Sequence, residues 1–385
     1  MNVLLCLHHE LDRNAGAPGA TLALGDELTR LGHSVSYLSH DDLSERLPPL
    51  AREVLFPELA ALRLRRGAAQ GADVIDASTG DAWLWARFLR GREAGGPALV
   101  TRSHGLEHRF WQEQRAEAHI HGRRVPARTR IYHGGWRLRE VAASLRLADA
   151  CVFLNREDRR FALDRLGVEG ERAHVLANGV PSAFLERAVG PAPAPGELGI
   201  AHIGSWAERK GSGYLAAALG GVLARHERTR VTFVGTRCPA EVVIGEFPAE
   251  VRSRVSVVPS YEHGDLPDLL EGHQIVVSAA LAEGFSLALP EAMACGLAPV
   301  ATSVGGAGAL IRDGHDGVLV APRDAAAIEA AVSQLVDDPE RLAALRAAAR
   351  TTAEGYSWEA VTRDTVAVYE AARAYAGGRS ASAIT

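Results

Sequence analysis

Short apolar runs alternate with amphipathic stretches along the first half of the chain. The run NVLLCLHH near the N-terminus is typical of a buried parallel strand, and the stretch TLALGDELTRL after the next loop has the apolar spacing of a helix. The segment SVSYLS then alternates apolar and polar residues as a strand does, so the chain is predicted to open with a βαβ unit. Further strand-like runs, ADVIDAS, ALVTRSH and ACVFLN, extend this unit to a doubly wound α/β domain.

The second half repeats the alternation after a segment rich in proline, alanine and glycine. That segment, residues 188–199, is predicted to be a linker. The strand-like runs after it are IAHIGS, VTFVG, VSVVP, QIVVSA, APVATS and GVLVAP. We therefore expect an α/β fold with two Rossmann-like domains, residues 1–187 and 200–356, followed by a last helix within 357–385. A cleft where the two domains face each other is the default ligand site.

Composition and charge exclude several classes of protein. With 47% hydrophobic and 23% charged residues, the 385-residue chain is not a coiled coil, a collagen or a disordered protein. No apolar run approaches the roughly 20 residues of a membrane-spanning helix, and the first residues lack the pattern of a signal peptide, so a cytoplasmic location is predicted. The net charge of -5 disfavours nucleic acid as a partner, and the scattered cysteines show no CxxC pair that would indicate a zinc site.

The segment EGFSLALPEAMACGLAPVATSVGG, residues 283–306, is the most informative for function. Gly284 allows a ligand to approach the backbone closely, and Ser286 is predicted to cap a helix whose free N–H groups suit a phosphate. Glu291 in the first turn of that helix can accept hydrogen bonds from vicinal hydroxyls, and Glu283 can contact a sugar or fix the loop. The alternative is that both glutamates only cap or solvate the start of the helix.

A second segment, HIGSWAERKGSGYL at residues 202–215, places two cations beside the start of a helix. A strand is predicted to end in Gly204, and Arg209 with Lys210 would form a clamp for a pyrophosphate group without a metal. A solvated pair of surface cations is the alternative, but ligands of α/β domains bind at the carboxyl edge of a sheet. No Asp-x-Asp motif occurs in the chain, so we predict neither a metal nor a resident cofactor.

The first half offers weaker candidates. Gly16 lies in the loop RNAGAPGA between strand and helix, which does not match GxGxxG. His104, in TRSHGLEH, can hydrogen-bond a sugar hydroxyl or assist proton transfer, although most of the 15 histidines must have structural or surface roles. Residues 122–146 concentrate arginine around Tyr132 and Trp136, a pattern typical of contact with an anionic acceptor or membrane surface, or of a solvated helical face.

At these segments the chain resembles glycosyltransferase family 4, whose members are retaining nucleotide-sugar transferases of GT-B architecture. The resemblance runs from NAGAPGATLALGDELTRLGHSV through SHGLEH, VLANGV, GSWAERKG and the 283–306 segment to DGHDGVLVAPRD. It implies two Rossmann-like domains facing across a cleft, with the last helix, within 357–385, completing the first domain. It also implies that the C-terminal domain binds most of the donor and the N-terminal domain most of the acceptor.

The resemblance also implies roles for single residues. In the family, the lysine matching Lys210 contacts the diphosphate, the glutamate matching Glu291 holds the ribose, and the one matching Glu283 lies by the donor sugar. The glycine at Gly16 approaches the phosphates, and His104 matches an active-site histidine. Many members have arginine where this chain has a serine after the strand, so the clamp would use the two later cations. The implied donor-binding residues are Gly16, Gly204, Ser205, Arg209, Lys210, Glu283, Gly284, Phe285, Ser286 and Glu291, and the implied catalytic residues are His104, Arg209, Lys210 and Glu283.

The function expected from these residues is metal-independent transfer of a sugar from a UDP- or GDP-type donor to an acceptor hydroxyl with retention. Because no pair of carboxylates has the arrangement of a glycosidase, a same-face displacement is favoured. The acceptor would be a sugar, a lipid-linked or a small molecule, in glycan, exopolysaccharide, glycolipid or natural-product synthesis, and peripheral contact with the inner face of a membrane through residues 122–146 stays open. A non-catalytic sugar-nucleotide-binding protein, an NDP-sugar epimerase of the same fold and a nicotinamide oxidoreductase are the alternatives.

Overall fold

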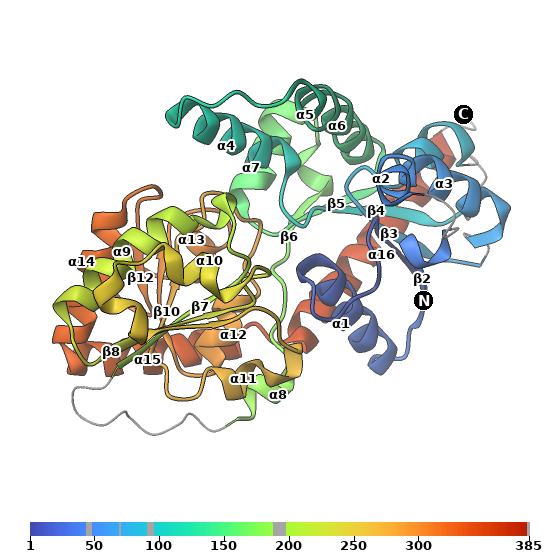
Figure 1. The fold of residues 1–385 in the computed structure, drawn as a ribbon. Helices are drawn as coiled ribbons and strands as arrows, with labels where there is room; N and C mark the ends of the chain where they lie inside the picture. Colours follow the sequence, from blue (N-terminus) through green and yellow to red (C-terminus); the bar gives the residue numbers. More distant parts are fainter. Residues whose placement is uncertain (44–47, 69–70, 91–95, 188–197, 383–385) are drawn as a thin grey trace. The chain divides into compact units, whose positions relative to one another are not determined.

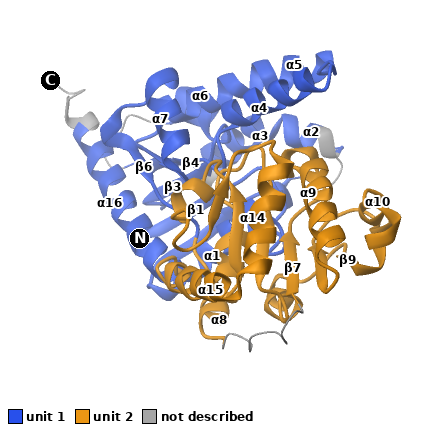
Figure 2. Ribbon diagram, turned by 90° about the vertical axis from the view of Figure 1, so that its left-hand side faces the viewer, with its two compact units in different colours: residues 1–178, 358–385 blue, residues 179–357 orange. Residues whose placement is uncertain are grey.

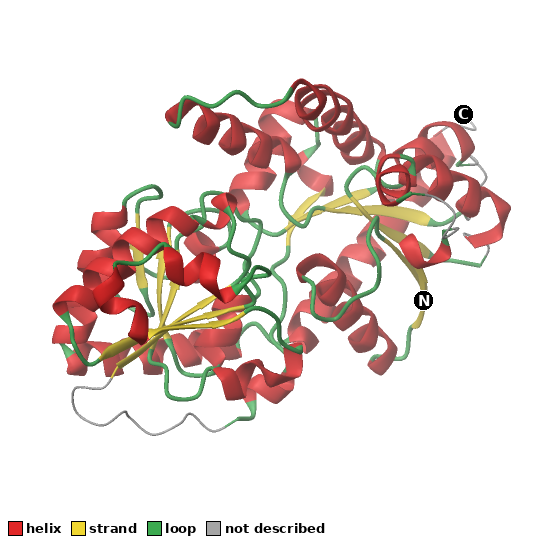
Figure 3. Ribbon diagram, in the orientation of Figure 1, coloured by secondary structure: helices red, strands yellow, loops and turns green. Residues whose placement is uncertain are grey.

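The computed structural model describes residues 1–43, 48–68, 71–90, 96–187 and 198–382. They divide into two compact units (Figure 2). Unit 1 contains Met1–Asn178 together with the described residues from Trp358 on, and unit 2 contains Gly179–Ser357. In Figure 3 each unit has its own sheet with helices packed against it.

Unit 1 contains one parallel sheet in the order β2-β1-β3-β4-β5-β6 (Figure 1). Its strands are β1 Asn2–Cys6, β2 Ser34–Leu38, β3 Val74–Ser78, β4 Ala98–Arg102, β5 Ala150–Phe153 and β6 Ala173–Val175. Its α-helices are α1 Gly16–Arg30, α2 Pro49–Val54, α3 Phe56–Arg63, α4 Glu107–Ile120, α5 Ala127–Ile131, α6 Arg137–Leu147, α7 Arg156–Leu166 and α16 Trp358–Ser382. The strands expected from the apolar runs of the first half are all present.

Unit 2 repeats the parallel arrangement in the order β12-β11-β10-β7-β8-β9. Its strands are β7 Leu198–Ile203, β8 Thr229–Val234, β9 Val255–Val258, β10 Ile275–Ser278, β11 Ala298–Thr302 and β12 Val318–Val320. Its α-helices are α8 Ser182–Leu185, α9 Ser212–Arg225, α10 Ala240–Gly245, α11 Leu266–Leu269, α12 Ala288–Ala294, α13 Ala307–Leu310, α14 Ala325–Asp337 and α15 Pro339–Glu354. The predicted strands of the second half are also found.

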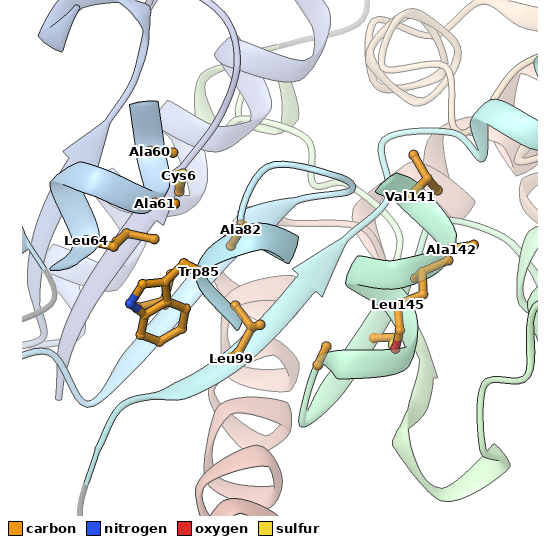
Figure 4. Close-up of a cluster of buried hydrophobic side chains, with 14 of the residues drawn as sticks. Cys6, Ala60, Ala61, Leu64, Ala82, Trp85, Leu99, Val141, Ala142 and Leu145 are labelled. Atoms are coloured by element: carbon orange, nitrogen blue, oxygen red, sulfur yellow. The ribbon is translucent and has the colours of Figure 1, made fainter. Parts of the chain in front are cut away.

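Alternate residues of β1 contribute to two hydrophobic clusters, one on each face of the unit 1 sheet. Leu4 and Cys6 face a cluster that includes Trp85, part of which Figure 4 shows. Val3 and Leu5 face the other side, where α1 and α16 pack. Because side chains of successive strand residues point to opposite faces, a continuous apolar run is what a strand covered on both faces requires.

The terminal helix α16 belongs to unit 1 and is fixed there by a buried polar group. The hydroxyl of Tyr369 donates to Oδ2 of Asp76 at 2.6 Å, and Nη2 of Arg102 donates to the same oxygen at 2.7 Å. Asp76 and Arg102 lie on β3 and β4. The polar contacts therefore join the last helix to strands from the first third of the chain.

The passage between the units differs from the predicted linker at 188–199. The division falls after Asn178, and residues 188–197 lie outside the described part of the chain, while the last two residues of the predicted linker begin β7. The predicted first domain, residues 1–187, included the residues of helix α8, but this helix belongs to unit 2. Its Phe184 is buried, and the guanidinium of Arg350 on α15 donates to the carbonyls of Phe184 and Leu185. These contacts hold the segment in unit 2.

Residues 122–146 form an exposed helical region of unit 1 followed by a buried helix face. Ile131 at the end of α5 is 73% exposed and Trp136 is 49% exposed, whereas Arg137 at the start of α6 is buried. Several arginines of this region are exposed. Among the described helices, none is both long and apolar enough to cross a membrane.

Candidate functional site

The strand order of unit 2 reverses between β7 and β10, which lie side by side in the middle of the sheet. In open α/β sheets, ligands bind beyond the carboxyl ends of the strands at such a reversal. The segment after β7 carries Arg209 and Lys210, and the segment after β10 carries Glu283 and Glu291. The two segments singled out from the sequence therefore meet at one edge of one sheet.

Two cations surround the partly buried carboxylate of Glu283, whose side chain is 13% exposed. The ammonium of Lys210 forms an ion pair with Oε2 of Glu283, and Nη1 of Arg209 lies 3.6 Å from the same oxygen. Nη1 of Arg209 also donates to the carbonyl of Ala282 at 3.1 Å. Burial raises the pKa of Glu283, but the charges of Lys210 and Arg209 outweigh it and hold the pKa below its usual value. The site therefore carries two cations for one carboxylate.

Glycines let the loop that carries Glu283 pack closely on its neighbour. Gly305 has a φ of +52°, and a Cβ there would overlap the carbonyl oxygen of Glu283. A Cβ on Gly306 would lie 2.8 Å from Cα of Phe285, so both positions require glycine. Phe285 itself is buried, with its ring 6.1 Å from that of Tyr356. The VGG end of the 283–306 segment thus supports its EGF start.

The start of α12 differs from the prediction that Ser286 caps it. The N-cap residue is Leu287, with φ -61° and ψ -39°, and no side chain caps the helix. The hydroxyl of Ser286 therefore accepts no capping hydrogen bond at the start of α12. Glu291 lies in the first turn of α12 as expected, directly after Pro290.

Glu291 is almost fully buried and pairs with a histidine from another loop. Its Oε1 lies 2.8 Å from Nε2 of His263, whose ring stacks on Phe184 at 5.3 Å. The hydrogen bond to Glu291 raises the pKa of His263, and burial raises the pKa of Glu291. The pair orients the carboxylate at the edge of the sheet. Sequence reasoning missed His263 because no local motif distinguishes it.

The sheet of unit 1 also reverses, between β1 and β3, and a second polar cluster lies there. Nδ1 of His8, just after β1, is 2.7 Å from Oδ1 of Asp81, just after β3. Asp81 is fully buried, and Nη2 of Arg137 lies 3.5 Å from it and donates to the carbonyl of Thr79 at 2.7 Å. Sequence reasoning missed this cluster, although polar residues directly after two predicted strands were a usable signal.

Glu107 and His104 follow β4 in the same unit. Oε1 of Glu107 accepts from the hydroxyl of Thr79 at 2.7 Å and lies 3.7 Å from Arg137. Burial, followed by the charge of Arg102, lowers the pKa of His104 to about 3, so its imidazole is neutral at pH 7. Its Nδ1 is buried without a hydrogen-bond partner among the described residues. A neutral imidazole there can hydrogen-bond a hydroxyl but supplies no positive charge.

Gly16 is the first residue of α1, and no protein atom explains its lack of a side chain. A Cβ on Gly16 would meet nothing within 4 Å among the described residues, whereas a Cβ on Gly19 would lie 2.6 Å from the carbonyl oxygen of Arg13. Gly19 is thus needed for packing. The backbone at Gly16 is left open at the start of a 15-residue helix that has no side-chain cap.

The chain matches two families of glycosyltransferases in sequence. Residues 16–184 match the family described as Glycosyltransferase Family 4, and residues 197–338 match the family described as Glycosyl transferases group 1. D-inositol 3-phosphate glycosyltransferase 1 of Catenulispora acidiphila is 38% identical over 144 residues, which is 37% of this chain and 32% of that protein. Glycogen synthase of Mycobacterium tuberculosis is 32% identical over 206 residues, which is 52% of this chain and 48% of that protein. The matches thus span about a third to a half of these relatives.

Solved structures share the fold over nearly the whole chain. Sucrose-phosphate synthase of Thermosynechococcus elongatus has a TM-score of 0.77 at 20% identity and covers 96% of this chain and 98% of its own. A protein of Anabaena, solved in complex with UDP, has a TM-score of 0.67 at 16% identity and covers 96% and 100%. At these identities the likeness establishes the fold, which is the GT-B architecture expected from the sequence.

Proposed function

Because the chain belongs to glycosyltransferase family 4 and has the GT-B fold, we propose that it transfers a sugar from a nucleoside-diphosphate sugar to an acceptor hydroxyl. The donor is of the UDP or GDP type, and the anomeric configuration is retained. The observation that carries this proposal is the group of two cations around Glu283 at the carboxyl edge of β7 and β10. Such a group favours a ligand with more than one negative charge.

The donor is proposed to lie along this edge. Arg209 and Lys210 bind the diphosphate, and the carboxylate of Glu291 accepts hydrogen bonds from the ribose hydroxyls while His263 orients it. Glu283 lies by the sugar and positions the two cations. In unit 1, separately, the open backbone of Gly16 at the start of α1 is proposed to suit a phosphate group.

The reaction is proposed to be a displacement on one face of the sugar. The bond from the anomeric carbon to the phosphate oxygen breaks as the bond to the acceptor oxygen forms. The proton of the acceptor hydroxyl passes to an oxygen of the departing diphosphate. Arg209 and Lys210 stabilise the charge that develops on the leaving group, so we propose that no divalent metal is needed.

Unit 1 is proposed to bind the acceptor. The partly exposed imidazole of His8, the Glu107 carboxylate and the neutral His104 offer hydrogen-bond partners for hydroxyl groups after β1 and β4. The exposed Ile131 and Trp136, among exposed arginines, support peripheral contact with an anionic membrane and hence a lipid-linked or glycan acceptor at its cytoplasmic face. A small natural-product acceptor requires no such contact.

The donor assignment is tested by binding and turnover. Purified protein is screened by thermal shift against UDP, GDP, ADP and dTDP sugars with and without magnesium, because a ligand that binds the native state raises its apparent stability. Turnover is then followed with the selected donor. Lys210→Ala and Glu291→Ala are expected to lower turnover at least about a hundredfold, in the range found when a charge-stabilising group is removed.

The control is Arg225→Ala, which removes an exposed cation of the same unit whose partner is Glu329. It should leave turnover unchanged. Near wild-type turnover in Lys210→Ala would overturn the assigned role. Conversion of the donor to another nucleotide sugar without any acceptor would show that the protein is an epimerase and not a transferase. Donor binding without turnover in the presence of acceptors would indicate a non-catalytic sensor.

A further inference from the structure

His202 on β7 is a buried histidine with one ring nitrogen left without a partner. The residue is 2% exposed, and its Nδ1 lies 2.9 Å from the carbonyl oxygen of Val277 on β10. A carbonyl oxygen only accepts hydrogen bonds, so Nδ1 carries the hydrogen and donates it. Nε2 is buried and has no hydrogen-bond partner among the described residues. An unpaired buried polar atom is costly unless a ligand completes it.

The unpaired nitrogen faces the position of Gly204. Gly204 directly follows β7, and a Cβ on it would lie 3.8 Å from Nε2 of His202 and 3.9 Å from Cε of Lys210. Gly204 has a φ of +141°, a conformation that favours glycine. The lack of a side chain thus leaves room between the imidazole and the lysine at the carboxyl edge of β7.

The surroundings keep the free imidazole neutral. Burial, opposed by the hydrogen bond to Val277 and reinforced by the charge of Lys210, lowers the pKa of His202 to about 4. On β8, the ring of Phe233 lies 5.8 Å from the imidazole and carries no charge. The nearby ammonium of Lys210 is paired with Glu283. Because Nδ1 holds the hydrogen, neutral Nε2 presents a lone pair, which repels an anionic oxygen unless a proton lies between them.

A diphosphate needs more than the cations of this site supply. Arg209 and Lys210 share the carboxylate of Glu283, so the three side chains together carry less positive charge than a nucleoside diphosphate carries negative charge. Ser205 is neutral and adds none. We propose that Nε2 of His202 binds a phosphate oxygen of the donor diphosphate and that the imidazole takes up one proton from solvent when the diphosphate binds. This inference rests on the proposed function and adds a proton-linked contact to its donor site.

The test compares variants that separate the two ring nitrogens. His202→Asn keeps an amide N–H near the position of Nδ1 for the carbonyl of Val277 and removes Nε2. His202→Gln places an amide N–H near the position of Nε2 but cannot take up a proton. His273→Asn is the matched control, because His273 is a largely buried histidine of the same unit that precedes β10, with its Nε2 bonded to Thr232 at 2.8 Å.

Binding of UDP, GDP, ADP and dTDP to the full chain is measured by titration calorimetry from pH 6 to pH 8.5, in buffers of different ionisation enthalpy. For the nucleotide that binds most tightly, the wild-type protein should take up close to one proton more than His202→Asn. The affinity of the wild-type protein for this nucleotide should fall as the pH rises, over the pH range in which binding takes up a proton. At pH 6, His202→Asn should bind about ten- to a hundredfold more weakly, the range for a hydrogen bond to a charged group, and the gap should narrow toward pH 8.5.

His202→Gln should recover part of the affinity without the extra proton, and His273→Asn should match the wild type in both measurements. Equal affinity and equal proton uptake in His202→Asn and the wild type would overturn the role of His202 and leave the donor site intact. A loss of affinity that is the same at every pH would also overturn it, because a merely structural effect has no proton linkage. Failure of the wild type to bind any of the four nucleotides would overturn the proposed function itself.

Discussion

At the scale of single residues, the proposed donor site contains a residue type found nowhere else in the chain. Lys210 is the only lysine of the sequence, in which all other residues of the combined count of 42 lysines and arginines are arginine. An ammonium group is a compact point charge, whereas a guanidinium is a planar fork. The compact group fits beside Gly204 and pairs with Glu283.

Gly305 is expected to position Glu283, and a matched pair of glycine substitutions tests this. Gly305→Ala and Gly314→Ala both place a side chain at positive φ, +52° and +73°, at a cost of about 1–2 kcal/mol in the free energy of unfolding. A Cβ at Gly314 meets nothing within 4 Å, but one at Gly305 overlaps the carbonyl of Glu283. We expect Gly305→Ala to weaken donor binding at least about tenfold by displacing Glu283.

Gly314→Ala should lose only the stability that the positive φ costs, less than Gly305→Ala loses, and should keep the wild-type donor affinity. Both quantities come from urea denaturation and calorimetry of the same preparations. Equal donor affinities in the two variants would show that the turn at Gly305 does not position Glu283.

At the scale of elements, the same arrangement recurs in both sheets. The strand order reverses once in each, and polar residues from the segments after the two strands at the reversal are paired. Nδ1 of His8 contacts Asp81 in unit 1, and Lys210 forms an ion pair with Glu283 in unit 2. Parallel strands bring their carboxyl ends to one edge, so residues distant in sequence meet there. The helices hold the sheets in shape but supply few of the site residues.

Helix α16 is the element whose attachment is most specific. Its Tyr369 donates to the Asp76 carboxylate that Arg102 also binds, and all three are buried. Tyr369→Phe should lower the free energy of unfolding by about 1.5–3 kcal/mol, the range for a hydrogen bond to a charged group. Tyr375→Phe, a more exposed tyrosine of the same helix, is the control and should change it by less than about 0.5 kcal/mol. Urea denaturation measures both, and equal effects would contradict the role given to Tyr369.

At the scale of the whole molecule, each unit has its own buried core and one unit is continuous in sequence. Unit 2 begins at Gly179 and ends at Ser357, and its ends meet where Val180 pairs with Ser357. Unit 1 is formed from both ends of the chain and needs Val368, Tyr369 and Ala372 of α16 in its core. We therefore expect only unit 2 to fold as a fragment cut from one continuous stretch of the chain.

A fragment of residues 179–357 is expected to fold cooperatively and to bind the nucleoside diphosphate within about tenfold of the full chain. A fragment of residues 1–178 should fail to fold, because several side chains of about 1.5–3 kcal/mol each are missing from its core. Circular dichroism, thermal melts and calorimetry of both fragments test this. A stable 1–178 fragment would show that α16 is not required for unit 1.

The order of elements was largely predictable from the sequence, because its signals are local. Apolar runs gave the strands, and the 3.6-residue spacing gave α1 and α16. The start of α12 and the place where the chain passes between units were mispredicted. Ser286 looked like a cap and a proline-rich segment looked like the boundary. In the structure the N-cap position is Leu287, no side chain caps the helix, and the buried Phe184 belongs to unit 2.

The candidate site was predictable only in part. Arg209, Lys210, Glu283 and Glu291 were found because they lie in short recognisable segments. His263, His202 and the pair of His8 with Asp81 were not, because each acquires its meaning from a partner on another strand or loop. A histidine alone carries no sign of which neighbour it will have.

The sequence by itself determined which segments become strands and helices and the family of the chain, and it singled out the residues of unit 2 that we propose for the donor site. The reason is that strand and helix periods, turn residues and motifs are short-range properties of the chain. Only the tertiary structure decided that β10 lies beside β7, which brings Lys210 to Glu283 across 73 residues of sequence and leaves Nε2 of His202 open beside Gly204. Strand order depends on how the whole unit packs its core, and no local pattern contains that information.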